Sequence, residues 1–273
     1  MQRPNRPMSG LEKFGLDTVS PSTINDWISY RPKFVIRKIY GYTDLPTSCA
    51  IERGNQSEYA VKLILQDKID TDEAIEKAIN NFDNVCNPDM KDYDLEKKCI
   101  PAIVMGSVKE ISSNFGEIIS FQEEIKGELG GYTYRGFTDF VLKDDKGNKC
   151  IVDLKTAKRK PYKLSSSHAR QISLYSHALD CEAQLLYIVP HKQTDRKTKI
   201  VSVKSTEAIW WSITEKDKRS YLEECEEVLR VMDMVLYNCN DKKEVAELCY
   251  PNIDDFYWDS PQILKIRKEI WNV

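Results

Sequence analysis

The sequence of 273 residues has no apolar run near the length of about 20 residues that a helix needs to cross a bilayer. Its first residues, Met1 to Ser9, carry two arginines but no apolar stretch after them, which is not the pattern of a secretory signal. We therefore expect no membrane partner and a protein that stays in the cytoplasm.

Closely spaced cysteine pairs are also absent. No two of the eight cysteines form a Cys-x-x-Cys pair, the spacing typical of zinc and iron–sulfur sites. Without an export signal, reduced structural thiols are a better interpretation than disulfides or a metal cluster.

The sequence also lacks a strong excess of one charge. The net charge of −3 does not announce a nucleic-acid partner, but it does not exclude one, because a nuclease needs only a local basic groove. Basic residues do cluster at 31–38, 155–163 and 191–199. Each cluster is either a solvated face or part of such a groove.

Hydrophobic periodicity predicts helices first, then strands, then helices again. Ser22 is the expected cap of the first helix, with Ile24, Trp27 and Ile28 on its apolar face. Gly130-Gly131 and residues 145–148 separate three strands of a meander. The remaining expectations are helices at 52–66, two within 71–115, 165–179 and 214–237, and strands at 118–125, 132–142, 149–154, 184–189 and 199–204.

The order of these elements predicts an α/β fold with helical flanks, because strands and a helix alternate only in the middle of the chain. We see no internal repeat and no long linker. Residues 1–17 are expected to be a flexible arm and 18–273 a single domain. Its core would span about 52–205 and its C-terminal helical region about 214–273, with Trp258 and Trp271 packing back.

Two acids in apolar strands carry the chemistry. Asp139 lies in a strand that is otherwise apolar or aromatic, and Asp153 follows Ile151 and Val152 near the end of the next strand. A carboxylate in such a place needs a cation or hydrogen bonds to compensate for lost solvation. Acids on adjacent hairpin strands can converge, and their oxygens suit Mg²⁺ or Mn²⁺.

Lys155 stands two residues after Asp153, so both side chains leave the same face of the strand. A cation there can orient a metal-bound water or stabilise the charge that develops on a phosphate. The alternative is an Asp–Lys pair at a strand end that serves only solubility.

Three further polar residues accompany this pattern. Gln171 and Tyr175 lie at i and i+4, on one face of the helix after the Asp-x-Lys strand, although an ordinary amphipathic helix would look the same. Glu58, after Arg53-Gly54, is either a third carboxylate of the site or an exposed helix residue.

Taken together, a meander bearing Asp and then Asp-x-Lys, followed by Gln-x-x-x-Tyr, resembles the PD-(D/E)XK nuclease superfamily. The RecB-type branch, which includes phage and mitochondrial exonucleases, is the most similar. Its serine-rich helix start and Arg-Gly motif correspond to Ser20-Pro-Ser-Thr with Tyr30–Phe34, and to Arg53-Gly54…Glu58. Tyr30 stands where iron–sulfur members have cysteine, so no cluster is expected, and Glu58 replaces a common histidine, as in lambda-type enzymes.

The resemblance implies a restriction-endonuclease-like core with a mixed central sheet, αβββαβ, and helical additions at both ends. It also implies that one or two Mg²⁺ or Mn²⁺ ions are held by three acids and a carbonyl, with catalytic help from a lysine, a glutamine and a tyrosine. The implied metal ligands are Glu58, Asp139, Asp153 and the Leu154 carbonyl; the other catalytic residues are Lys155, Gln171 and Tyr175; and the candidates for DNA contacts are Arg31, Arg53, Arg135 and Lys158.

The implied reaction is hydrolysis of linear duplex DNA to 5′-phosphate products in phage recombination or DNA repair, with single-stranded DNA as a further candidate partner. Arg53 would grip a terminal 5′-phosphate, or else pair with Glu52 or another surface acid. A single-strand annealing protein, a homo-oligomer and the host cytoplasm fit a phage enzyme. The alternatives are a structure-selective flap nuclease or endonuclease on the same fold, and an inactive DNA-binding protein.

Overall fold

The computed structural model describes residues 8–144, 146–195, 197, 201–252, 254, 258 and 260–273. The chain divides into two compact units. The first comprises Met1–Pro46, Lys126–Gly136 and Glu215–Val273, and the second, which we call the sheet unit, comprises Thr47–Ile125 and Phe137–Thr214. The predicted division into one domain of residues 18–273 stays a prediction. Among the described residues, every helix is too short or too polar to cross a membrane.

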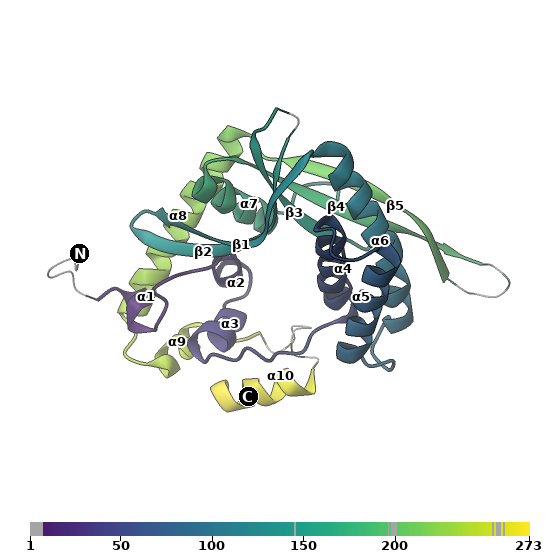
Figure 1. Cartoon of the computed structure of the whole chain (residues 1–273). Coiled ribbons are helices and arrows are strands. Elements are labelled where there is room, and N and C mark those ends of the chain that lie inside the picture. The colour runs from purple at the N-terminus through teal and green to yellow at the C-terminus, as the bar shows by residue number, and fades with distance from the viewer. Residues whose placement is uncertain are drawn as a thin grey trace. The chain divides into compact units, whose positions relative to one another are not determined.

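A mixed sheet of five strands, in the order β1-β2-β3-β4-β5, organises the fold (Figure 1). β2 and β3 are antiparallel, β3 and β4 are parallel, and β4 and β5 are antiparallel. This sheet confirms the predicted α/β class and the mixed order of the core. The strands are β1 Glu117–Leu129, β2 Tyr132–Lys143, β3 Lys149–Thr156, β4 Glu182–Thr194 and β5 Val201–Ser212.

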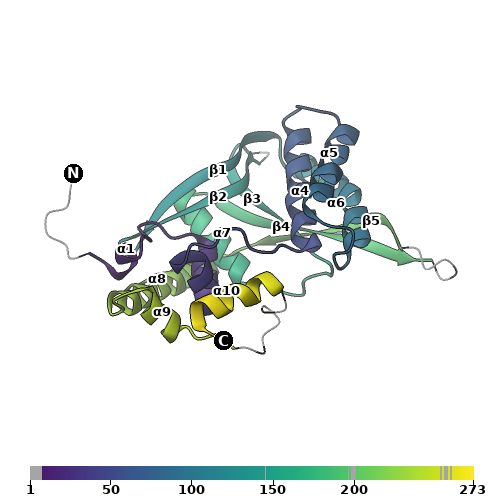
Figure 2. The same cartoon turned by 90° about the horizontal axis from the view of Figure 1, so that it is seen from below.

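Three helices cover one face of this sheet. They are α4 Cys49–Leu65, α5 Thr71–Val85 and α6 Tyr93–Asn114, and Figures 1 and 2 show them side by side. Ser48 and Asp70 cap the first two by accepting from backbone N–H groups of the first turn. Their apolar side chains pack against alternate strand residues, among them Phe140, Val152 and Leu186.

The opposite face of the sheet is covered by α7, Ser166–Leu179, which joins the parallel strands β3 and β4. Such a connection must cross over the sheet, so a helix is the usual solution. Ile172 and Tyr175 of α7 pack against Ile151 and Leu185. Side chains alternate along β3, so Asp153 and Lys155 face α7 as Ile151 does.

The first unit is mainly helical and buries both predicted tryptophans. Trp258 and Trp271 are 2% and 8% exposed, with ring centroids 6.0 Å apart in an edge-on arrangement. Its helical elements are α1 Gly10–Lys13, α2 Pro21–Ser29, α3 Arg31–Phe34, a π-helical turn at Val35–Ile39, α8 Glu215–Tyr237, α9 Lys242–Leu248 and α10 Pro261–Trp271.

Two details of α2 differ from the prediction. Ser20 is the N-cap, because its side chain accepts from the N–H of Thr23 and Pro21 begins the helix. Ser22 therefore lies inside the helix. Ile24 and Trp27 are buried as expected, but Ile28 is 38% exposed and lies beside the apolar face rather than on it.

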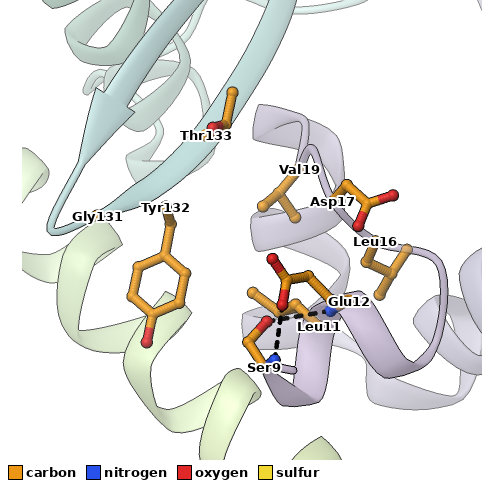
Figure 3. A pocket seen from close by; sticks show the side chains of 9 residues that line it. All are labelled: Ser9, Leu11, Glu12, Leu16, Asp17, Val19, Gly131, Tyr132 and Thr133. Carbon is orange, nitrogen blue, oxygen red and sulfur yellow. Dashed lines mark hydrogen bonds between the residues drawn. The ribbon is translucent and has the colours of Figure 1, made fainter. Parts of the chain in front are cut away.

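The flexible arm of residues 1–17 stays a prediction; the structure places the short helix α1 at Gly10–Lys13 within it. Residues 1–7 lie outside the described part, while α1 begins with a reciprocal capping box between Ser9 and Glu12 (Figure 3). Leu11 is 3% exposed. Its backbone N–H donates to Oδ1 of Asp233 in α8 at 2.9 Å.

Candidate active site

Asp139 and Asp153 face each other across the β2–β3 hairpin. The antiparallel register pairs Phe140 with Val152, and one step further along it Asp139 lies opposite Asp153. Asp139 accepts a hydrogen bond of 2.8 Å from the backbone N–H of Leu154, and Asp153 is fully buried. The hairpin thus holds two carboxylates together on the face that α7 covers.

The surroundings of Asp139 disfavour its ionised form. Burial and then the neighbouring charge of Asp153 hold the pKa of Asp139 well above its ordinary value. Burial also raises the pKa of Glu58, which extends from α4 and accepts a weak 3.4 Å hydrogen bond from Gln122 of β1. The charge of Asp153 raises the pKa of Glu58, and the charge of Glu58 raises the pKa of Asp139. The structure therefore brings all three predicted acids into one electrostatic group.

Lys155 neutralises part of this acidic group. Its ammonium lies 2.5 Å from Oδ2 of Asp153, and its side chain is 25% exposed. Burial lowers the pKa of Lys155, but the charges of Asp153 and Asp139 outweigh burial and raise the pKa above its ordinary value. The lysine therefore stays protonated and reaches both the acids and solvent.

α7 contributes the two predicted polar residues. Gln171 donates through Nε2 to Oδ1 of Asp153 at 2.9 Å and contacts the hydroxyl of Tyr175 at 3.1 Å. Burial raises the pKa of Tyr175 to about 12, so this phenol remains neutral at ordinary pH. The helical spacing of i and i+4 thus turns a glutamine and a tyrosine toward one carboxylate.

His168 and Tyr187 lie beside the site and were not among the predicted residues. Tyr187 of β4 is the parallel-register partner of Lys155, and its hydroxyl is 2.5 Å from Nδ1 of His168. Burial and the charge of Lys155 lower the pKa of His168. The only sequence signal was the position of His168 three residues before Gln171, on the same face of the helix.

Arg53 is not an exposed residue at a helix start. It lies inside α4 and is only 2% exposed, because its guanidinium forms a buried ion pair with Glu96 of α6. It also donates to Oγ1 of Thr156 at 2.9 Å. Both predicted environments of Arg53 are therefore corrected: its partner is not Glu52 or a surface acid, and a DNA phosphate cannot approach it without breaking the pair.

The other three candidates for DNA contacts do not all belong to the sheet unit. Lys158 is part of it and pairs with Asp92 at 2.7 Å. Arg31 and Arg135 belong to the first unit and are exposed. Arg31 stacks over the ring of Trp27 at 4.8 Å.

The chemistry of the three acids fits a hard divalent cation. Oδ2 of Asp153 is buried and, among the described residues, has no hydrogen-bond donor in good geometry beyond its ion pair with Lys155. Carboxylate repulsion and this poorly satisfied oxygen are what a Mg²⁺-sized ion relieves. In the part of the chain that the structure describes, no three His, Cys, Asp or Glu side chains form a metal-ligand cluster.

All eight cysteines are free thiols, and all except Cys181 are buried. The expectation that the chain carries no iron–sulfur cluster stays a prediction.

Two acids on a hairpin, Asp-x-Lys on its second strand and Gln-x-x-x-Tyr on the crossover helix define a nuclease-type site. The chain belongs to the PD-(D/E)XK nuclease superfamily, whose family model matches residues 18–249. Nucleases of this superfamily act on DNA and generally use divalent metal ions. The match extends beyond the sheet unit into the C-terminal helices.

A solved structure shares this fold at low sequence identity. A candidate exonuclease from Eubacterium rectale matches with a TM-score of 0.53 and 13% identity, covering 95% of this chain and 98% of that one. LHK-Exo, solved in complex with dAMP, matches with a TM-score of 0.43 and 10% identity over 87% of this chain and 99% of that one. No curated protein matches the sequence.

Proposed function

We propose that the chain is a DNA exonuclease that uses Mg²⁺ or Mn²⁺ to hydrolyse phosphodiester bonds of linear duplex DNA and leaves 5′-phosphate products. The observation that carries the proposal is the convergence of Asp139 and Asp153 beside the protonated Lys155. Its setting would be phage recombination or DNA repair.

In this proposal Glu58, Asp139, Asp153 and the Leu154 carbonyl hold one or two cations. A bound cation would lower the pKa of the water that it coordinates and would neutralise charge on the phosphate. The raised pKa values of Asp139 and Glu58 support this role, because burial and neighbouring carboxylates disfavour uncompensated negative charge there.

The remaining residues act directly on the substrate or on the acids. Lys155 holds its proton and presents a fixed charge where negative charge develops on the phosphate. Gln171 fixes one oxygen of Asp153, which leaves the other oxygen turned to Lys155. Tyr175 steadies Gln171 through the 3.1 Å contact.

The test compares a 5′-labelled linear duplex, the same single strand and a covalently closed circle, each with Mg²⁺ and with excess chelator. We expect mononucleotides or short products from linear DNA in Mg²⁺ only, and no cutting of the circle. Cutting of the closed circle at a comparable rate would replace the exonuclease by an endonuclease on the same fold. Hydrolysis in chelator would contradict the metal-dependent site itself.

A further inference from the structure

The segment between β3 and α7, residues 157–165, follows directly on the strand that carries Asp153 and Lys155. It is rich in exposed basic residues and places a tyrosine among them. These residues are Lys158, Arg159, Lys160, Tyr162 and Lys163.

Two of the lysines hold the segment against the sheet unit. Lys158 pairs with Asp92 at 2.7 Å and with Glu96 at 3.1 Å, and Lys160 pairs with Glu207 of β5. The start of the segment is fixed as well, because the N–H of Ala157 donates to the carbonyl of Ile188 at 3.2 Å. These contacts give the segment a defined position beside β3.

The charged and aromatic residues between and after these anchors are exposed to solvent. Arg159 and Lys163 are exposed and form no ion pair with any residue that the structure describes. Tyr162 is 96% exposed and makes no hydrogen bond or ring contact within the described chain. Pro161, immediately before it, fixes its own φ and restricts the backbone of Lys160.

A single exposed tyrosine is ordinary on a protein surface. This one stands between two unpaired cations, on an anchored segment, next to a catalytic strand. Aromatic rings that stack on bases, with cations that contact the neighbouring phosphates, are how proteins hold single-stranded nucleic acid without sequence preference.

We propose that Tyr162, Arg159 and Lys163 form a platform that binds a single-stranded DNA segment beside the active site, with a base stacked on Tyr162. The inference rests on the proposed function and adds to it a preference for unpaired DNA. The seven Cα–Cα steps from Lys155 to Tyr162 span at most about 25 Å, so the platform holds the strand within several nucleotides of the acids.

The platform is tested by fluorescence anisotropy with a labelled single strand and a blunt duplex, in excess chelator so that no DNA is cut. We expect Tyr162→Ala to weaken single-strand binding by about 5- to 150-fold, the range for loss of one stacked base, and to change duplex binding little. Tyr162→Phe keeps the ring and should bind as the wild type does. Tyr250→Ala, which removes another exposed tyrosine, is the matched control and should change nothing.

The salt dependence of binding distinguishes the contribution of Arg159 and Lys163 from that of the Tyr162 ring. Arg159→Ala and Lys163→Ala should each lower the slope of log affinity against log salt by about 0.7, as expected for one phosphate contact on a single strand. Tyr162→Ala should leave this slope unchanged, because stacking releases no counterion.

Equal single-strand affinity of the wild type and Tyr162→Ala, or the same loss in Tyr250→Ala, would overturn the platform. Because Tyr162 packs against nothing, its replacement should not change the melting temperature, which is measured in parallel. Metal-dependent hydrolysis is assayed separately. Hydrolysis with unchanged binding would reject the platform alone, whereas absence of hydrolysis on every DNA would reject the proposed function and leave the binding result to stand.

Discussion

Asp139 accepts a 2.8 Å hydrogen bond from the backbone N–H of Leu154, the residue between Asp153 and Lys155. This bond fixes one acid of the site to the strand that carries the other acid and the lysine. The hairpin therefore sets the spacing of the charged groups through the backbone, and flexible side chains have little freedom to change it. The cost is two carboxylates held together in a buried place, which the raised pKa of Asp139 reflects.

Replacing Asp139 separates catalysis from stability. We expect Asp139→Asn to lower hydrolysis by orders of magnitude while the metal-free protein becomes more stable at neutral pH, because the amide oxygen still accepts from Leu154 without a charge. The folded pKa of Asp139 is raised, so the protonated acid stabilises the fold at low pH and this stability is lost as pH rises through the folded pKa. The melting temperature in chelator should therefore favour the variant increasingly from acid to neutral pH. A variant less stable than the wild type at neutral pH would contradict this electrostatic account.

Lys155 is expected to act on turnover more than on binding. Removal of one preorganised charge at such a site costs roughly 10²–10³ in rate, so Lys155→Ala should lower kcat by about that factor. Affinity for DNA, measured in chelator, should fall much less. Lys143→Ala removes a half-buried lysine of β2, which pairs with Glu117, and serves as the control. If Lys155→Ala bound DNA tenfold more weakly yet turned over normally, Lys155 would be a phosphate contact only.

Gln171 is expected to control metal affinity through Asp153. Gln171→Leu keeps the size of the side chain but removes the 2.9 Å hydrogen bond to Asp153. Losing a hydrogen-bond partner behind a metal ligand typically costs 10- to 100-fold in affinity or activity. We expect the Mn²⁺ concentration for half-maximal hydrolysis to rise by about that factor, with activity partly restored at high Mn²⁺. An unchanged Mn²⁺ requirement would mean that Gln171 does not orient the acid.

Arg53 is expected to support the fold and not to read DNA ends. Arg53→Ala removes the buried partner of Glu96 and leaves it only the half-exposed Lys158, which should cost up to about 3–5 kcal/mol of unfolding free energy. The double variant Arg53→Met with Glu96→Met should recover much of this loss, measured by chemical denaturation. Any variant that folds should digest 5′-phosphate and 5′-hydroxyl duplexes in the same ratio as the wild type. A selective loss of the 5′-phosphate substrate would instead restore Arg53 as a phosphate anchor.

Local patterns predicted most of the sheet and which of the candidate side chains lie together. The turn between β1 and β2 forms at Gly130 and Gly131, both with positive φ, because glycine adopts that backbone without strain. The Asp-x-Lys and Gln-x-x-x-Tyr spacings placed Asp153, Lys155 and Gln171 correctly, since strand and helix periods fix which side chains share a face.

Long-range partners could not be predicted in this way. Glu96 lies 43 residues from Arg53, on another helix, and no local pattern links the two. The register that sets Tyr187 beside Lys155 depends on how β4 docks along β3, which only packing decides. β5 extends to Ser212, well past the predicted end at 204, because polar residues such as Ser205 and Glu207 sit in an edge strand that needs only one paired neighbour.

The most direct test of the central claim is hydrolysis of one end-labelled linear duplex by the wild type and Asp153→Asn, across a titration of Mg²⁺ with chelator at the starting point. We expect no products in chelator and hydrolysis by the wild type that rises and saturates with Mg²⁺. The rate of hydrolysis by Asp153→Asn should be lower by orders of magnitude at every Mg²⁺ concentration. Circular dichroism of both proteins confirms that the fold is retained. Full activity of a folded Asp153→Asn protein, or wild-type hydrolysis in excess chelator, would contradict the assignment of this site.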